Sequence, residues 1–362
     1  MPQRFRMLYI FYAIVMKFLV IIYLPLGFTL LFCTISAEDA NISNLLTSLQ
    51  VTFDVYGGSV KFIILSFLLL KLRKTNVLTH RLDKRCRAAD EIVELHRMVR
   101  FGQKVVLLFL LNFISYAVTT FLGAVIKGHP PYAMYYPFLE WRRSNVEFFF
   151  VSLFDFFLIH LACIQQTIND AYPVVYINIL RTHIKTLLLR IDKLGTSSLE
   201  QNLVELKLCI KDHQLLIELY NIIAPMTSIT IFVQFTVTAI CIGTGLINLV
   251  VFSNEFSSRV GCCFFIIAVA MEIFPTCYYA QCLIDDSNQI SDVIFHSNWV
   301  EQSKEYRQLL IFFMQRTQRP MFLTAGKLFP VTLNSFLSIA KFSFSLYTLM
   351  ENMNLKERLG ME

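Results

Sequence analysis

The sequence predicts an all-α integral membrane protein, in which one domain (1–362) forms a bundle of seven transmembrane helices. Composition is the first reason: 56% of the 362 residues are hydrophobic and only 16% are charged, whereas soluble domains are nearer half apolar and a quarter charged. Length is the second, because a membrane-crossing helix needs about 20 predominantly apolar residues. Such stretches lie at 8–36, 48–70, 105–126, 147–168, 221–252, 260–284 and 328–350.

The first apolar stretch is expected to stay in the protein as a membrane anchor. It follows Arg4 and Arg6, as the apolar part of a signal peptide would. It is too long for that role, however, and lacks a clear cleavage site with small residues. We therefore count 8–36 as the first span.

Basic residues predict the orientation of the bundle. They crowd the connecting segments 71–104 and 181–211 but are scarce after the first, third and fifth spans. Because cytoplasmic loops carry the excess of lysine and arginine, the N-terminus is predicted to be cytoplasmic and the C-terminus extracellular. Asn41, in Asn-Ile-Ser, is then a glycosylation candidate in the first external loop. This orientation is opposite to that of a G-protein-coupled receptor.

The segments between the later spans predict a cytoplasmic anchor made of helices. In 170–220, apolar residues such as Leu180, Ile184 and Leu187 recur three or four positions apart. We expect this segment to extend the fourth and fifth spans as helices joined by GTSS at 195–198. The apolar run 309–314 is too short to span and predicts an amphipathic helix within 286–327. Simple solvated extensions of the spans are the alternative.

The sequence offers no catalytic or metal-binding constellation. It has no glycine-rich phosphate loop, no HExxH and no GxSxG. Its nine cysteines form neither a disulfide framework nor a zinc pattern. We therefore predict no enzymatic activity, no cofactor and no metal. The net charge of +6 is spread over the loops rather than gathered in one basic domain. We therefore expect the lipid bilayer, and not a nucleic acid, as a partner.

Ionisable side chains inside the spans are candidate functional groups. Asp155 and His160 lie in the fourth span and Glu272 in the sixth. Charged groups are costly in a bilayer and often mark functional sites there. Structural pairing inside the bundle is the alternative for each of them.

The outer halves of several spans predict a site for a small volatile or lipophilic ligand. They carry aromatic and apolar side chains with isolated hydroxyl groups, which suit a ligand held mainly by dispersion. Packing against lipid or a neighbouring helix is the alternative for any single residue. The candidate ligand-binding residues are Phe53, Tyr56, Tyr116, Thr120, Phe121, Phe149, Ser152, Leu153, Phe156, Phe264 and Phe265.

The last span is unusually polar, and its polar residues lie on one side. At about 100° per residue, they form a single stripe, which we call the polar stripe. Its members are Asn334, Ser338, Lys341, Ser345, Thr348 and Asn352. Polar residues in a span normally face the bundle interior or water. The stripe therefore predicts a buried or water-facing surface.

From the sixth span onward the sequence resembles the insect odorant receptor family. The resemblance rests on CYY in 274–299, on SNW at the end of that segment, and on QRTQRP and TAG in 305–326. A serine- and phenylalanine-rich final helix follows in 327–350. The first 200 residues agree with the family only in length, hydropathy and span placement. SLYTLMENM near the end favours the odorant branch over the related gustatory receptors.

The resemblance implies an odorant-gated, nonselective cation channel in the plasma membrane of olfactory neurons. It implies a tuning subunit that assembles with a co-receptor into a heterotetramer, with each last helix lining one central pore. The implied pore-lining residues are Ser338, Lys341, Ser345, Thr348, Leu349, Asn352 and Met353, the gate being placed at Leu349 and Met353. A gustatory-type channel is the alternative, followed by a secondary transporter or a metabotropic seven-helix receptor.

Overall fold

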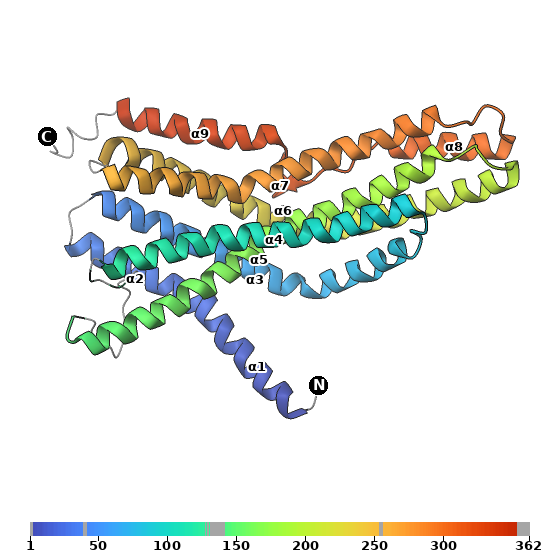
Figure 1. Ribbon diagram of the computed structural model, residues 1–362. Coiled ribbons are helices and arrows are strands. Elements are labelled where there is room, and N and C mark those ends of the chain that lie inside the picture. The colour runs from blue at the N-terminus through green and yellow to red at the C-terminus, as the bar shows by residue number, and fades with distance from the viewer. Residues whose placement is uncertain are drawn as a thin grey trace.

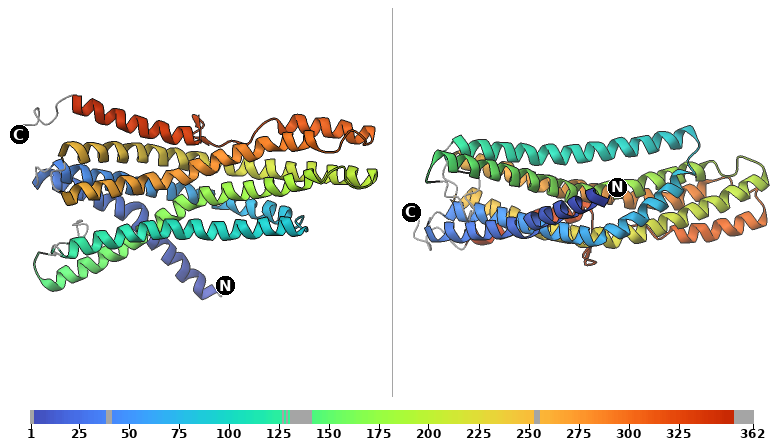
Figure 2. Two further views of the ribbon diagram at one scale, coloured as in Figure 1. Left: turned by 45° about the horizontal axis from the view of Figure 1, so that its top comes forward. Right: turned by 90° about the horizontal axis from the view of Figure 1, so that it is seen from below.

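The computed structural model is an elongated bundle of long helices that run side by side (Figure 1). It describes residues 3–38, 42–126, 128, 130, 142–252 and 256–352. The α5–α6 connection and α8 lie at one end, on the right of Figure 1, and the C-terminal end of α9 lies toward the other. Figure 2 shows α1 leaving the bundle at an angle and α9 lying along one side of it.

The described elements are almost entirely helical. In chain order they are α1 (Gln3–Phe18), the π-helix η1 (Leu19–Tyr23), α2 (Leu24–Glu38), α3 (Ile42–Asp83), α4 (Ala89–Ile126), α5 (Asn145–Asp192), α6 (Leu199–Ile247), the π-helix η2 (Asn248–Phe252), α7 (Phe256–His296), α8 (Lys304–Thr317), β1 (Thr324–Ala325), β2 (Phe329–Pro330) and α9 (Leu333–Asn352). The strands β1 and β2 pair in antiparallel fashion just before α9.

Within the described residues, 6 helical segments are long and apolar enough to cross a membrane. Each of them overlaps one of the first six predicted spans. The helix α9, where the seventh span was expected, is not among them. It also begins at Leu333 rather than at 328, because Phe329 and Pro330 form β2 instead. As predicted, α8 is a separate helix and, at 14 residues, is short for a span.

The largest apolar core lies where α5, α6, α7 and α8 meet, away from the C-terminal end of α9. Leu187 of α5, Leu216 of α6 and Ile294 of α7 pack there with Tyr306 and Leu310 of α8. As predicted, α5 and α6 continue as helices through 170–220 and are joined across 195–198. The side chains of this core are almost completely removed from solvent, which stabilises the packing of the four helices.

A buried cluster of charged residues fixes the start of α4 against this core. Arg190 of α5 contacts Glu91 of α4 and Asp212 of α6, both at 2.6 Å. Arg85, between α3 and α4, reaches the same Asp212 at 3.0 Å. Because Arg190 serves two carboxylates from different helices, it ties α4, α5 and α6 together.

Gly195, in the turn between α5 and α6, should not tolerate a larger residue. Its φ of 86° lies in the left-handed region, and an added Cβ would overlap the backbone carbonyl oxygen of Asn298. We expect Gly195→Ala to cost about 1–3 kcal/mol of stability, measured as a lower unfolding temperature of the detergent-solubilised protein. Gly123→Ala is the matched control, since a Cβ at Gly123 meets nothing within 4 Å. Equal unfolding temperatures for the two variants would contradict this expectation.

Candidate binding site

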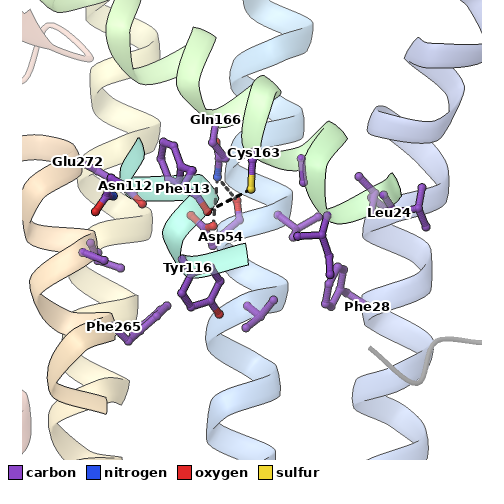
Figure 3. Close-up of a pocket in the computed structure, with 17 residues that line it drawn as sticks. Leu24, Phe28, Asp54, Asn112, Phe113, Tyr116, Cys163, Gln166, Phe265 and Glu272 are labelled. Atoms are coloured by element: carbon purple, nitrogen blue, oxygen red, sulfur yellow. Dashed lines mark hydrogen bonds between the residues drawn. The ribbon is translucent and has the colours of Figure 1, made fainter. Parts of the chain in front are cut away.

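A mostly apolar cavity of about 80 Å³ lies between α2, α3, α4, α5 and α7 (Figure 3). It lies in the half of the bundle remote from α8, because its lining residues come from the first half of α3, α5 and α7. The lining residues are Leu24, Phe28, Val51, Asp54, Val55, Asn112, Phe113, Tyr116, Leu158, Ile159, Ala162, Cys163, Gln166, Phe265, Ala268, Val269 and Glu272.

One wall of the cavity is a small apolar cluster. Leu24 and Phe28 of α2 pack against Leu158 of α5, and all three side chains are almost fully buried. The Cys163 thiol donates to the backbone carbonyl of Phe113 and so presents little polarity to the cavity. A surface of this kind holds a small ligand through dispersion and the hydrophobic effect.

The remaining wall carries carboxyl and amide groups. Gln166 of α5 donates through Nε2 to the Asp54 carboxylate of α3 at 3.1 Å. Gln234 of α6, which lies behind the cavity wall, donates through Nε2 to Glu272 of α7 at 2.9 Å. Asn112 of α4 lies beside Glu272 (Figure 3). These groups supply the few polar contacts that orient a ligand in an apolar pocket.

A buried lysine joins the acidic groups below the cavity. Lys61 of α3 is 2% exposed, and its Nζ lies 2.6 Å from Oδ1 of Asp170 of α5. The same ammonium group also donates to the Oε1 atom of Gln234. Asn169 donates to the backbone carbonyl of Gly58 at 2.9 Å. The polar groups of α3, α5, α6 and α7 thus form one network in the middle of the bundle.

The structure brings few of the predicted ligand-binding residues to this cavity. Tyr116 and Phe265 line it. The hydroxyl group of Tyr56 instead bonds that of Thr29 at 2.8 Å, and the Phe121 and Phe156 rings contact each other edge to face. The other described side chains lie apart from it: Ser152 is buried elsewhere, while Phe53, Phe149, Leu153 and Phe264 are exposed. The side chain of Thr120 and the residues Asn41 and Met353 lie outside the described part of the chain.

The polar cavity residues were largely missed by sequence reasoning. Glu272 had been singled out as an ionisable group inside a span, but Asp54, Lys61, Gln166 and Asp170 had not. A signal was present, because Asp54 and Lys61 are seven positions apart in an otherwise apolar stretch. Residues spaced in this way share one helix face. Asp155 has an interaction partner elsewhere, and His160 bonds the carbonyl of Phe156 at 2.7 Å.

The polar stripe of α9 points away from the bundle. Ser338, Lys341 and Ser345 are exposed. The opposite face of α9 packs on α6 and α7: Phe336 contacts Phe274 of α7 edge to face, and the hydroxyl of buried Ser343 donates to the carbonyl of Ala239 of α6.

A bundle of long apolar helices around a mostly apolar cavity is typical of a membrane protein that binds small apolar molecules. Comparison with known proteins identifies the family. Residues 41–344 match the family profile described as 7tm Odorant receptor. Odorant receptor 42a of Drosophila melanogaster is 34% identical over 99% of this chain and 89% of its own. Odorant receptor 59b of the same species is also 34% identical, over 98% of this chain and 89% of its own.

The chain therefore belongs to the insect odorant receptor family, and it is a receptor rather than an enzyme. The fold agrees. The solved olfactory receptor OR5 of Machilis hrabei superposes with a TM-score of 0.74 at 15% identity, covering 98% of this chain and 91% of that one. The structure of OR5 in complex with eugenol gives a TM-score of 0.75 at 14% identity over the same shares of the two chains.

Proposed function

We propose that this receptor is a subunit of an odorant-gated, nonselective cation channel in the plasma membrane. A small volatile odorant binds in the cavity, and α9 crosses the membrane as a seventh span and lines the pore. The N-terminus is cytoplasmic and the C-terminus extracellular, as the distribution of basic residues indicates. The anchor built from 170–220 and 286–327 is then cytoplasmic. The related OR5, solved with eugenol, supports an odorant ligand for this fold.

The direction of the polar stripe is the observation that carries this proposal. At about 100° per residue, the stripe lies on the side of α9 opposite Phe336 and Ser343, which face α7 and α6. A bilayer would strongly disfavour a row of exposed polar groups that includes Lys341. A water-filled pore shared with other subunits removes that cost, because the stripe then faces water.

A single subunit supplies only one wall of such a pore, so the proposal requires an oligomer. We assign the other walls to a co-receptor, in a heterotetramer of the kind that the family resemblance implies. Leu349 is 56% exposed next to the polar stripe, which suits a residue that narrows the pore. Ser338, Lys341, Ser345, Thr348, Asn352 and Met353 remain the other proposed pore-lining residues.

A short chain of contacts connects the cavity with the base of α9. Glu272 lines the cavity, and Phe274, two residues further along α7, contacts Phe336 of α9 with ring centroids 5.6 Å apart. A ligand that binds one arrangement of α7 better than another shifts the population toward it. Movement of α7 would then displace α9 and widen the gate.

Heterologous expression tests this function directly. Cells that express the receptor together with a co-receptor should carry a cation current during odorant application, and cells with either subunit alone should not match it. A response that requires GTP, or a full current without the co-receptor, would contradict the heteromeric channel. A protease site added to the N-terminus should be protected in intact cells, and cleavage there would contradict the orientation.

Lys341 should reduce cation flow through the pore. Replacing it with glutamine removes a positive charge from the polar stripe without shortening the side chain greatly. We expect Lys341→Gln to raise the single-channel cation conductance or the permeability of divalent relative to monovalent cations, because repulsion of cations falls. The matched control is Lys104→Gln, which removes an exposed lysine of α4 outside the proposed pore. An unchanged conductance in Lys341→Gln would place this side chain away from the conduction path.

A further inference from the structure

Two carboxyl groups in the polar wall of the cavity each keep an oxygen without a hydrogen-bond donor among the described residues. The Nε2 groups of Gln166 and Gln234 are already used by Asp54 and Glu272. Among the described residues, the second carboxylate oxygens of Asp54 and Glu272 accept no hydrogen bond. The amide oxygen of Gln166 has no partner either, although Gln166 is only 7% exposed and lines the cavity.

The acidic groups around the cavity also outnumber the basic groups. Asp54, Asp170 and Glu272 all act electrostatically on Lys61, but Lys61 forms its ion pair with Asp170. Asp54 and Glu272, the two carboxyl groups that face the cavity, have no ion-pair partner in the described part of the chain. Glu272 is only 5% exposed. A buried carboxylate without enough donors carries a large desolvation cost.

We propose that this cavity selects odorants that carry an O–H or N–H donor on an apolar tail, that is, small alcohols or amines. The donor head binds between Glu272 and Asp54, which both line the cavity. The tail lies along Leu24, Phe28 and Phe265, which in Figure 3 surround the rest of the cavity. Asn112 has an amide that donates as well as accepts, and it lies beside Glu272. The inference rests on the proposed odorant site and adds the chemistry that it recognises.

The two proposed recognition groups, Asp54 and Glu272, are not members of the ion pair that joins α3 and α5. Lys61 and Asp170 pair with each other below the cavity and line a second cavity of about 10 Å³, which is too small for an odorant. Asp54 and Glu272 each receive one amide hydrogen bond and keep the other oxygen open. A donor from the ligand would satisfy one of the open oxygens in this network.

A set of ligands with matched chain length tests the inference. 1-Hexanol and hexylamine donate hydrogen bonds, whereas 2-hexanone and hexane do not. We expect at least one donor ligand to open the channel at about a tenfold lower concentration than 2-hexanone, since a hydrogen bond to a buried acceptor is worth roughly one factor of ten. Whichever of 1-hexanol and hexylamine opens the channel at the lower concentration shows whether the site prefers a neutral or a cationic donor group.

Variants of the two carboxyl groups complete the test. Glu272→Gln should lower sensitivity to the donor ligands about tenfold and change the response to 2-hexanone much less. Asp54→Asn gives an independent measurement if Glu272→Gln does not reach the membrane. Asp285→Asn, which removes an exposed carboxyl group from the same helix, is the matched control and should leave the order of ligands unchanged.

The failure of the inference differs from the failure of the channel function. Equal sensitivity to 2-hexanone and the donors in the unmodified receptor would overturn the inference, as would an unchanged donor preference in both carboxyl variants. The unfolding temperature of the purified receptor provides a readout without current. If donor ligands raise it selectively but no ligand evokes a current, the recognition stands and the proposed channel function fails.

Discussion

Replacing Lys61 with methionine is expected to destabilise the receptor severely. The substitution leaves Asp170 buried without its cation and Gln234 without its donor. Removing one partner of a buried ion pair costs about 3–5 kcal/mol, a large part of the stability of a typical domain. The expected result is loss of most receptor from the cell surface and a lower unfolding temperature in detergent.

Two further variants show whether the unpaired charge is the cause. The double variant Lys61→Met with Asp170→Asn removes both charges and should recover much of the surface expression. Lys71→Met, which replaces an exposed lysine of the same helix, should behave like the unmodified receptor. A double variant that is no better than Lys61→Met would show that packing around the lysine, rather than the charge, matters.

Replacing Arg190 with methionine should have a comparable effect near the α5–α6 end of the bundle. Arg190 is the shared partner of Glu91 and Asp212, and its own side chain is 11% exposed. Its loss leaves two buried carboxylates, of which only Asp212 keeps a second arginine, Arg85. We expect a loss of about 3–5 kcal/mol, measured by thermal unfolding of the purified protein and by the yield of assembled complex.

A surface arginine is the control for this substitution. Arg97 also pairs with a carboxylate, Glu94, but its side chain is 66% exposed. Exposed ion pairs contribute about 0–1 kcal/mol, so Arg97→Met should barely change the unfolding temperature. If Arg190→Met were equally mild, the cluster would be a consequence of the helix packing rather than one of its causes.

The helices were predictable because their signals are long and repeated. An apolar run of about 20 residues, or a periodic pattern such as that of Leu180, Ile184 and Leu187, identifies a helix from local sequence alone. The helix α8 was predicted from its amphipathic pattern. The start of α9 was misplaced because 328–332 is as apolar as a span, while Pro330 and the left-handed backbone at Gly326 and Lys327 favour the β1–β2 turn.

The cavity was much less predictable, because it depends on which faces of five helices meet. Aromatic residues are found on every face of these spans, so their presence does not show which ones point inward. Tyr116 and Phe265 reach the cavity, whereas Phe149 and Phe264 do not. The rarer signal was the ionisable residue in an apolar stretch, since only an interior position can accommodate it. Asp54 and Lys61 therefore indicate the interior faces of the helices more reliably than the phenylalanines do.

The cavity and the charged cluster around Arg190 lie toward opposite ends of the same helices. The residues that line the cavity come from one half of the bundle, whereas Arg190, Glu91 and Asp212 lie near the α5–α6 connection. Substitutions at distant, non-contacting sites have nearly additive effects. Residues around the cavity can therefore be exchanged without loosening the charged cluster at the other end.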